Sequence, residues 1–73
     1  MSNFHILTTC TKDNVTYRVC TANVHDARSG WVYEVIVWNM NIGEGLTASR
    51  YPFTTEGQMG ALKRHLEVVE KYS

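Results

Sequence analysis

Polar and hydrophobic residues alternate along most of the chain, whereas near the C-terminus hydrophobic residues recur every three or four positions. Alternation with a period of two is typical of β-strands, and the longer spacing is typical of an amphipathic helix. Residues 4–10, 15–22, 31–40 and 46–53 fit the strand pattern, and residues 56–71 fit the helix pattern. The sequence therefore predicts an α+β fold: an antiparallel four-stranded sheet (ββββα) with one C-terminal helix packed on one face.

The run at residues 31–40 (WVYEVIVWNM) is the longest strongly β-prone stretch, and both of its alternating faces are largely apolar. One face carries Trp31, Tyr33, Val35 and Val37, and the other carries Val32, Glu34, Ile36, Trp38 and Met40. A strand needs apolar residues on both faces only when both are covered. Because one helix covers only one face, we expect the other face to be the working surface.

Short polar segments set the pairing of the strands. Asp13 and Asn14 tolerate the left-handed backbone of a tight turn. Pairing about them sets Cys10 opposite Tyr17 and Cys20 opposite Leu7, with the two cysteines on opposite faces. Residues 23–30 (NVHDARSG) read as a polar loop.

The last two strands are expected to pair about Gly43, within the break at residues 41–45. This register sets Tyr33 opposite Phe53 and Val35 opposite Tyr51, on the side of the helix. Pro52 has no backbone N–H to donate, so the last strand is expected to be an edge or to end there.

The predicted helix has a capping box at its start, with Thr55 followed three residues later by Gln58. One apolar stripe, the expected core stripe, consists of Met59, Leu62, Leu66 and Val69. A second stripe beside it consists of Ala61, His65, Val68 and Tyr72. We expect His65 to be a partly exposed packing residue, and Gly60 to mark a close approach of the helix to the sheet.

The second face of the sheet is the predicted partner-binding surface. Its apolar centre is expected to hold Ile36, Trp38 and Leu7. Arg18 and Arg50 are expected to lay their apolar stems over this centre and to place charge at its rim, near Glu34. Trp and Arg are typical anchors of protein interfaces, so this face is expected to bind a protein.

Composition limits both the size and the partners of the molecule. The 73 residues have room for one domain, residues 1–73, with one small core. Seven basic residues balance seven acidic ones, which disfavours electrostatic capture of nucleic acid or of an anionic membrane. Neither a membrane-spanning run nor a signal peptide is expected. With two cysteines, we expect a cytoplasmic protein with reduced thiols and no cofactor.

Two alternatives to a protein-binding module use other chemistry. A nucleic-acid-binding module would use Trp38 for base stacking, with Arg18 and Arg50 on the same sheet surface. A small metal-binding or enzymatic protein would use the residue types of a zinc site, in the order His5, Cys10, Cys20 and His25. The strand pairing separates the two cysteines, so we expect no metal and no disulfide. The chain has no Gly-rich nucleophile turn and little length left to build a pocket, so we expect no enzyme.

Residues 30–35 (GWVYEV), followed by residues 53–56 (FTTE) at a helix start, resemble DNA-reading domains built of a three-stranded sheet and a helix. Plant AP2 domains and the arm-binding domains of phage integrases are examples, and the resemblance covers roughly residues 30–66. Such a resemblance implies DNA binding through the sheet. The strands of this chain lack the Arg and Lys residues that would contact phosphates and bases, so no binding residue is carried over.

These observations favour a non-enzymatic protein-interaction module. We expect a homodimer that buries the second sheet face and that binds another protein. Small neutral α+β chains of this kind are often accessory or inhibitory proteins of phages and other mobile elements, and we expect such a role here.

Overall fold

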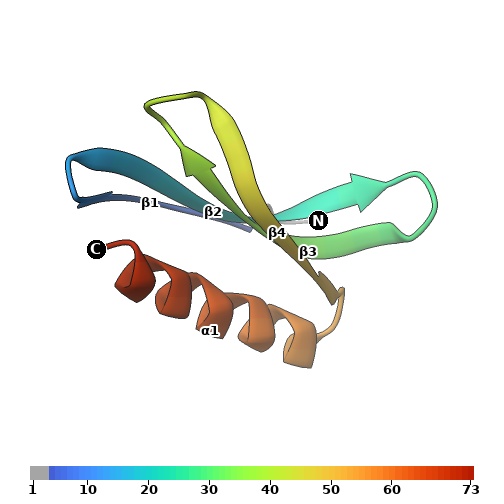
Figure 1. The fold of residues 1–73 in the computed structure, drawn as a ribbon. Coiled ribbons are helices and arrows are strands. Elements are labelled where there is room, and N and C mark those ends of the chain that lie inside the picture. The colour runs from blue at the N-terminus through green and yellow to red at the C-terminus, as the bar shows by residue number, and fades with distance from the viewer. Residues whose placement is uncertain (1–3) are drawn as a thin grey trace.

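The computed structural model describes residues 4–73 and shows four strands followed by one helix (Figure 1). The elements are β1 (His5–Lys12), β2 (Val15–Asp26), β3 (Gly30–Asn39), β4 (Glu44–Pro52) and α1 (Thr55–Lys71). The strands form one antiparallel sheet in the order β1-β2-β3-β4, and α1 lies across one side of it. The predicted ββββα architecture is confirmed. No helix within residues 4–73 is long and apolar enough to cross a membrane.

The hairpin of β1 and β2 has the predicted two-residue turn. Asp13 and Asn14 have φ angles of 52° and 65°, the left-handed conformation that fits the twist of two paired strands. The register follows from this turn, with Cys10 opposite Tyr17 and Leu7 opposite Cys20. The pairing predicted for this hairpin is therefore confirmed, and it places Cys10 and Cys20 on opposite faces.

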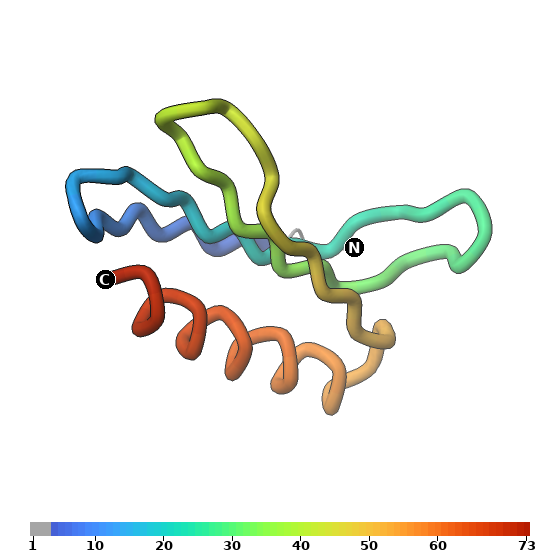
Figure 2. Tube along the Cα trace, in the orientation of Figure 1, coloured from blue at the N-terminus to red at the C-terminus, as the bar shows by residue number. Residues whose placement is uncertain are grey.

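The polar loop predicted at residues 23–30 is wrong, because most of this segment is strand. β2 continues to Asp26, which pairs with Gly30 at the start of β3. The turn spans residues 27–29, where the Asp26 carboxylate accepts the backbone N–H of Arg28 at 2.7 Å and of Ser29 at 3.4 Å. This end of the hairpin extends past the first turn of α1 (Figure 2), so little burial is required there and polar residues fit a strand.

The register predicted for β3 and β4 is also wrong, by two residues. Tyr33 pairs with Tyr51 and Val35 with Ser49. Residues 40–43 form the turn, and the register slips at a bulge next to Val37. A slip of two residues keeps each side chain on its face of the sheet, so the predicted division between the two faces still holds. β4 is an edge strand that ends at Pro52, as expected.

The core lies between the sheet and α1. Val19, Val35 and Val37 are at most 2% exposed and pack with Ala61 and Val68 of the helix. The helix approaches closely at two glycines. A Cβ on Gly57 would lie 1.8 Å from the carbonyl oxygen of Pro52, and one on Gly60 would lie 3.2 Å from the ring of Tyr51. The expected close approach at Gly60 is confirmed.

The face of α1 that packs on the sheet differs from the predicted one. Met59 and Leu66 of the expected core stripe are 64% and 68% exposed, while Leu62 and Val69 are half-buried. The buried positions are Gly57, Ala61, His65 and Val68, largely the second stripe. The reason is size, because glycine and alanine let the helix axis come close to the strands. The N-cap is also one residue earlier than predicted: Thr54 Oγ1 accepts the N–H of Gly57 at 3.0 Å.

His65 is buried rather than partly exposed, so the expectation for this residue was wrong. Its side chain joins α1 to two strands: Nε2 lies 2.8 Å from the hydroxyl of Thr8, and Nδ1 lies 2.7 Å from the hydroxyl of Thr21. His65 is 3% exposed and Thr21 is fully buried. Burial lowers the pKa of His65, which favours the neutral imidazole at neutral pH.

Candidate functional site

One face of the sheet is covered by α1, and no other element of residues 4–73 covers the opposite face (Figure 1). We call this opposite face the open face. It carries all six residues predicted to bind a partner, because they alternate along the strands with the buried core residues. They are Leu7, Arg18, Glu34, Ile36, Trp38 and Arg50.

An apolar row crosses the middle of the open face. Leu7 pairs with Cys20, Cys20 with Ile36, and Ile36 with Ala48, so each of the four strands contributes one side chain. Leu7 is 49% exposed, and Ala48 on the edge strand is exposed as well. A continuous apolar row left open to water is typical of a binding surface.

Trp38 lies beside this row and shapes the surface around it. Its ring packs over Gly45, where a Cβ would lie 3.7 Å from the ring carbon Cζ3, yet Trp38 is still 38% exposed. Shallow hollows of about 270 and 370 Å³ border Trp38, one toward β4 and one toward β1. The hairpin of β3 and β4 curls away from α1, toward the side of the open face (Figure 2). Trp38 thus separates two depressions that a partner's side chains would fill.

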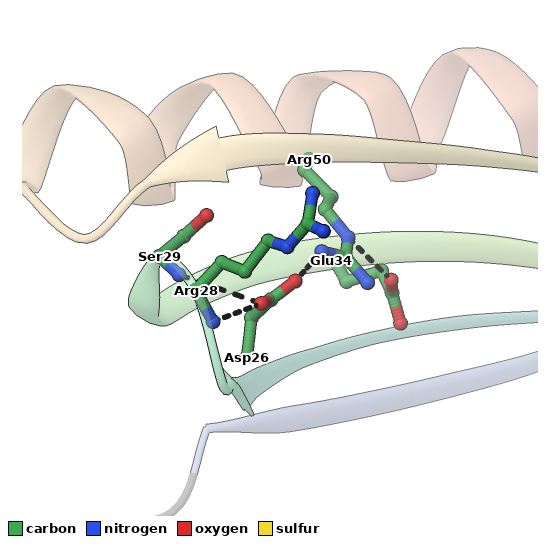
Figure 3. A network of polar contacts seen from close by, with 5 residues as sticks. All are labelled: Asp26, Arg28, Ser29, Glu34 and Arg50. Atoms are coloured by element: carbon green, nitrogen blue, oxygen red, sulfur yellow. Dashed lines mark hydrogen bonds and ion pairs between the residues drawn. The ribbon is translucent and has the colours of Figure 1, made fainter.

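A network of acidic and basic side chains lies at one end of the open face (Figure 3). Arg50 Nε donates to Glu34 Oε2 at 3.0 Å, and Arg50 Nη1 forms an ion pair with Asp26. The two carboxylates hold the pKa of Arg50 above its ordinary value. The backbone N–H of Arg28, followed by the Arg50 guanidinium, holds the pKa of Asp26 below its ordinary value. The charge of Arg50 is therefore compensated within the chain.

Arg18 lies toward the other end of the open face and is unpaired. Its Nε is buried without a hydrogen-bond partner, and its guanidinium forms no ion pair with any residue of the described part, 4–73. Arg18 pairs with Trp38 in the sheet and lines the hollow toward β1. Its charge is therefore not compensated by a carboxylate of residues 4–73, and a carboxylate supplied by another molecule would complement it.

The four residues of the zinc-binding alternative do not lie together in the structure. They are His5, Cys10, Cys20 and His25. His5 and Cys20 meet on the open face, with Nε2 3.3 Å from Sγ. Cys10 is buried on the helix side, where its thiol lies 3.9 Å from the carbonyl oxygen of Val69. His25 stacks edge-on against Trp31 near the end of the hairpin. Between residues 4 and 73, no three His, Cys, Asp or Glu side chains are placed to hold a metal ion.

The chemistry available to Cys20 is that of a thiol rather than a thiolate. Burial, and secondly the carboxylate of Glu34, raise its pKa, while Arg18 opposes them. The thiolate is the nucleophilic form of cysteine. Both cysteines are free, and Cys20 is a half-buried part of the apolar row.

Two further groups of exposed apolar side chains lie outside the predicted site. Trp31 and Phe53 are 40% and 38% exposed, with ring centroids 6.1 Å apart, on the side of the sheet that carries α1. Met59 and Leu66 lie on the outer face of α1. The sequence pattern assigned all four to the helix side or the core, and no local signal distinguished them from buried residues.

Comparisons of the chain with protein-family models, with curated proteins and with solved structures gave no significant match.

Proposed function

We propose that this protein is a non-enzymatic protein-interaction module that binds a protein chain through the open face. The observation that carries the proposal is the apolar row across all four strands with the exposed Trp38 beside it. Apolar centres that contain Trp and have Arg at their rim are typical of the regions that contribute most binding energy at protein interfaces.

The electrostatics of the open face favour a protein over a nucleic acid. Arg50, one of the two arginines on the surface of the nucleic-acid alternative, is held by Asp26 and Glu34. The chain as a whole has a formal net charge of zero. Binding of nucleic acid requires uncompensated positive charge along the contact surface, and within residues 4–73 Arg18 alone offers it on the open face. A mixed surface of apolar, acidic and basic groups suits a protein partner.

The finer expectations from the sequence remain proposals of the same kind. They are a homodimer, a further protein partner, an accessory or inhibitory role of the phage type, and a cytoplasmic location. The homodimer is the most specific of them, and the contacts that favour it are taken up in the next subsection.

Two tryptophans of similar exposure provide a matched test. Trp38 lies on the open face and Trp31 on the opposite side, and they are 38% and 40% exposed. Trp38→Ala should weaken protein association by at least ~2 kcal/mol and leave a folded chain, whereas Trp31→Ala should leave association unchanged. Light scattering over a concentration series measures self-association, and recovery of bound proteins on a tagged chain measures other partners.

Circular dichroism of both variants checks that they are folded. The proposal would be overturned if Trp38→Ala and Trp31→Ala had equal effects on association. It would also be overturned if only Leu66→Ala, on the outer face of α1, removed the bound partner, because the binding surface would then be the helix.

A further inference from the structure

The charges on the open face are arranged at opposite ends of the apolar row. Along β2 and β3, Arg18 lies on one side of the row, two residues from Cys20, and Glu34 lies on the other side, two residues from Ile36. Asp26 extends the acidic end through its contact with Arg50. The open face therefore has the order basic, apolar, acidic along the strand direction.

This order is self-complementary under one kind of two-fold symmetry. In a face-to-face dimer the two-fold axis lies in the interface, between the two sheets. If the axis runs along the apolar row, the row meets its own copy and the two ends exchange places. Arg18 then faces the end that holds Glu34 of the partner subunit, and the same contact occurs twice. An axis along the strands would instead set each end against itself and would bring like charges together.

The pairing state of the charged groups agrees with this arrangement. The guanidinium of Arg18 forms no ion pair within residues 4–73, so its charge is available to a carboxylate of another chain. The acidic end holds two carboxylates that share the Arg50 guanidinium (Figure 3). A neutral chain also lacks the net repulsion that would oppose self-association.

We propose that the occupant of the open face is a second copy of this chain, related by a two-fold axis along the row of Leu7, Cys20, Ile36 and Ala48. In this dimer Arg18 pairs with Glu34 of the partner subunit, and Cys20 lies next to Cys20 of the partner subunit. The inference rests on the proposed function, because it names the protein that binds at the same surface.

Charge exchange tests the arrangement directly. Arg18→Glu and Glu34→Arg each place like charges at both contacts of their own homodimer, so each variant alone should dissociate at least about tenfold more readily than the wild type. An equimolar mixture of the two variants should recover wild-type association, because both contacts in the mixed dimer join opposite charges. Sedimentation velocity of the wild type, the variants and the mixture provides the measurement. Lys63→Glu on the outer face of α1 changes the net charge as Arg18→Glu does and should leave the dimer intact.

Cross-linking gives a second readout that does not depend on Glu34→Arg, which also removes an acceptor of Arg50. A short bis-maleimide should link two chains that carry Leu7→Cys together with Cys20→Ser, because position 7 is exposed at the β1 end of the row and lies opposite its own copy in the proposed dimer. Met59→Cys in the same Cys20→Ser chain is the control and should give no linked dimer, because Met59 is exposed on the outer face of α1. Arg18→Glu should reduce the linked fraction in proportion to its loss of dimer.

The outcomes separate this inference from the proposed function. A wild type that stays monomeric at about one hundred micromolar would overturn the second-copy inference, since a stable dimer has a dissociation constant well below that concentration. A dimer that the variant mixture does not restore, or that Leu7→Cys does not cross-link, would overturn the two-fold arrangement. In either case the proposed function would stand if Trp38→Ala, but not Trp31→Ala, lost a different bound protein.

Discussion

The two faces of the sheet are built from the same strands but differ in how far their apolar side chains are buried. Val37 is 1% exposed under α1, whereas its neighbour Trp38 is 38% exposed on the open face. Both faces of β3 are apolar, and the single helix accounts for most of the burial. Val32, next to Val24 and Pro52 in the sheet, is the buried exception among the open-face residues of β3. The helix face forms the core, and the open face keeps apolar surface that folding does not use. Apolar surface of that kind is typical of binding sites.

The faces differ also in how their polar groups are satisfied. On the helix face, both ring nitrogens of His65 have hydroxyl partners on the strands. On the open face, the guanidinium of Arg18 has no ion-pair partner within residues 4–73. A fold stabilises itself by completing its internal hydrogen bonds, and a binding surface gains affinity from groups that only a partner completes. The helix face therefore holds the contacts that stabilise the fold, and the open face holds the groups that the proposed partner would complete.

The largest loss of stability is expected at the closest contact between the helix and the sheet. Gly57→Ala should lower the free energy of unfolding by about 3 kcal/mol or more, because the added Cβ would overlap the carbonyl oxygen of Pro52. Gly60→Ala is the control, since its Cβ would meet only the Tyr51 ring at 3.2 Å and alanine favours the helix by ~1 kcal/mol. Urea denaturation measures both, and equal losses would show that Gly57 is not the contact that limits the approach.

Two neighbouring residues of β3 separate the faces most directly. Val37→Ala should cost about 2–3 kcal/mol of folding free energy, because it removes two methyl groups from the core. Ile36→Ala removes more atoms, but from the open face, and should cost the monomer about 1 kcal/mol or less while weakening association. Urea denaturation at protein concentrations below the dissociation constant of the dimer measures the free energy of unfolding of the monomer. Light scattering measures association. A larger stability loss at Ile36 than at Val37 would contradict the assignment of the faces.

The buried histidine predicts how the stability of the helix face depends on pH. Because the pKa of His65 is lowered in the folded state, the unfolded chain binds a proton first as the pH falls. The contribution of the neutral His65 side chain to the free energy of unfolding should therefore be fully present above about pH 6.5, the ordinary histidine pKa. It should be lost as the pH falls toward the lower pKa of the folded state. Urea denaturation between about pH 7.5 and pH 5 measures the slope, in a range where few carboxylates titrate.

His65→Leu should remove most of this slope. His25→Gln, at an exposed position near the end of the hairpin of β2 and β3, should retain it. A slope that survives His65→Leu would mean that another group is responsible.

The smallest effect is expected on the outer face of α1, where the sequence pattern predicted the core. Leu66→Ala should change the free energy of unfolding by no more than ~0.5 kcal/mol, because Leu66 is 68% exposed. Val68→Ala, a smaller truncation, should cost more because Val68 is 2% exposed. Thermal denaturation of the two variants measures the difference. A larger drop in melting temperature for Leu66→Ala than for Val68→Ala would contradict the assignment of the helix face.

Much of the candidate site could be predicted from the sequence, because the face of a strand residue depends only on alternation. Ile36 and Trp38 were assigned to the uncovered side even though the register of β3 and β4 was wrong by two residues. The ion pair of Arg50 with Asp26 could not be predicted. Asp26 belongs to a segment whose polar residues resemble a loop, and its position beside Arg50 requires pairing across three strands.

The sequence by itself determined the four strands apart from the last part of β2, the two-residue turn at Asp13 and Asn14, and the side of the sheet on which the predicted strand residues lie. These features follow from local periodicity and backbone preference. Only the tertiary structure decided which stripe of α1 is buried. By hydrophobicity the stripe of Met59 and Leu66 was the better candidate, yet the stripe with Ala61 and His65 is buried. The distance between helix and sheet made that choice, because the small residues allow close contact and the strands supply Thr8 and Thr21 for the imidazole.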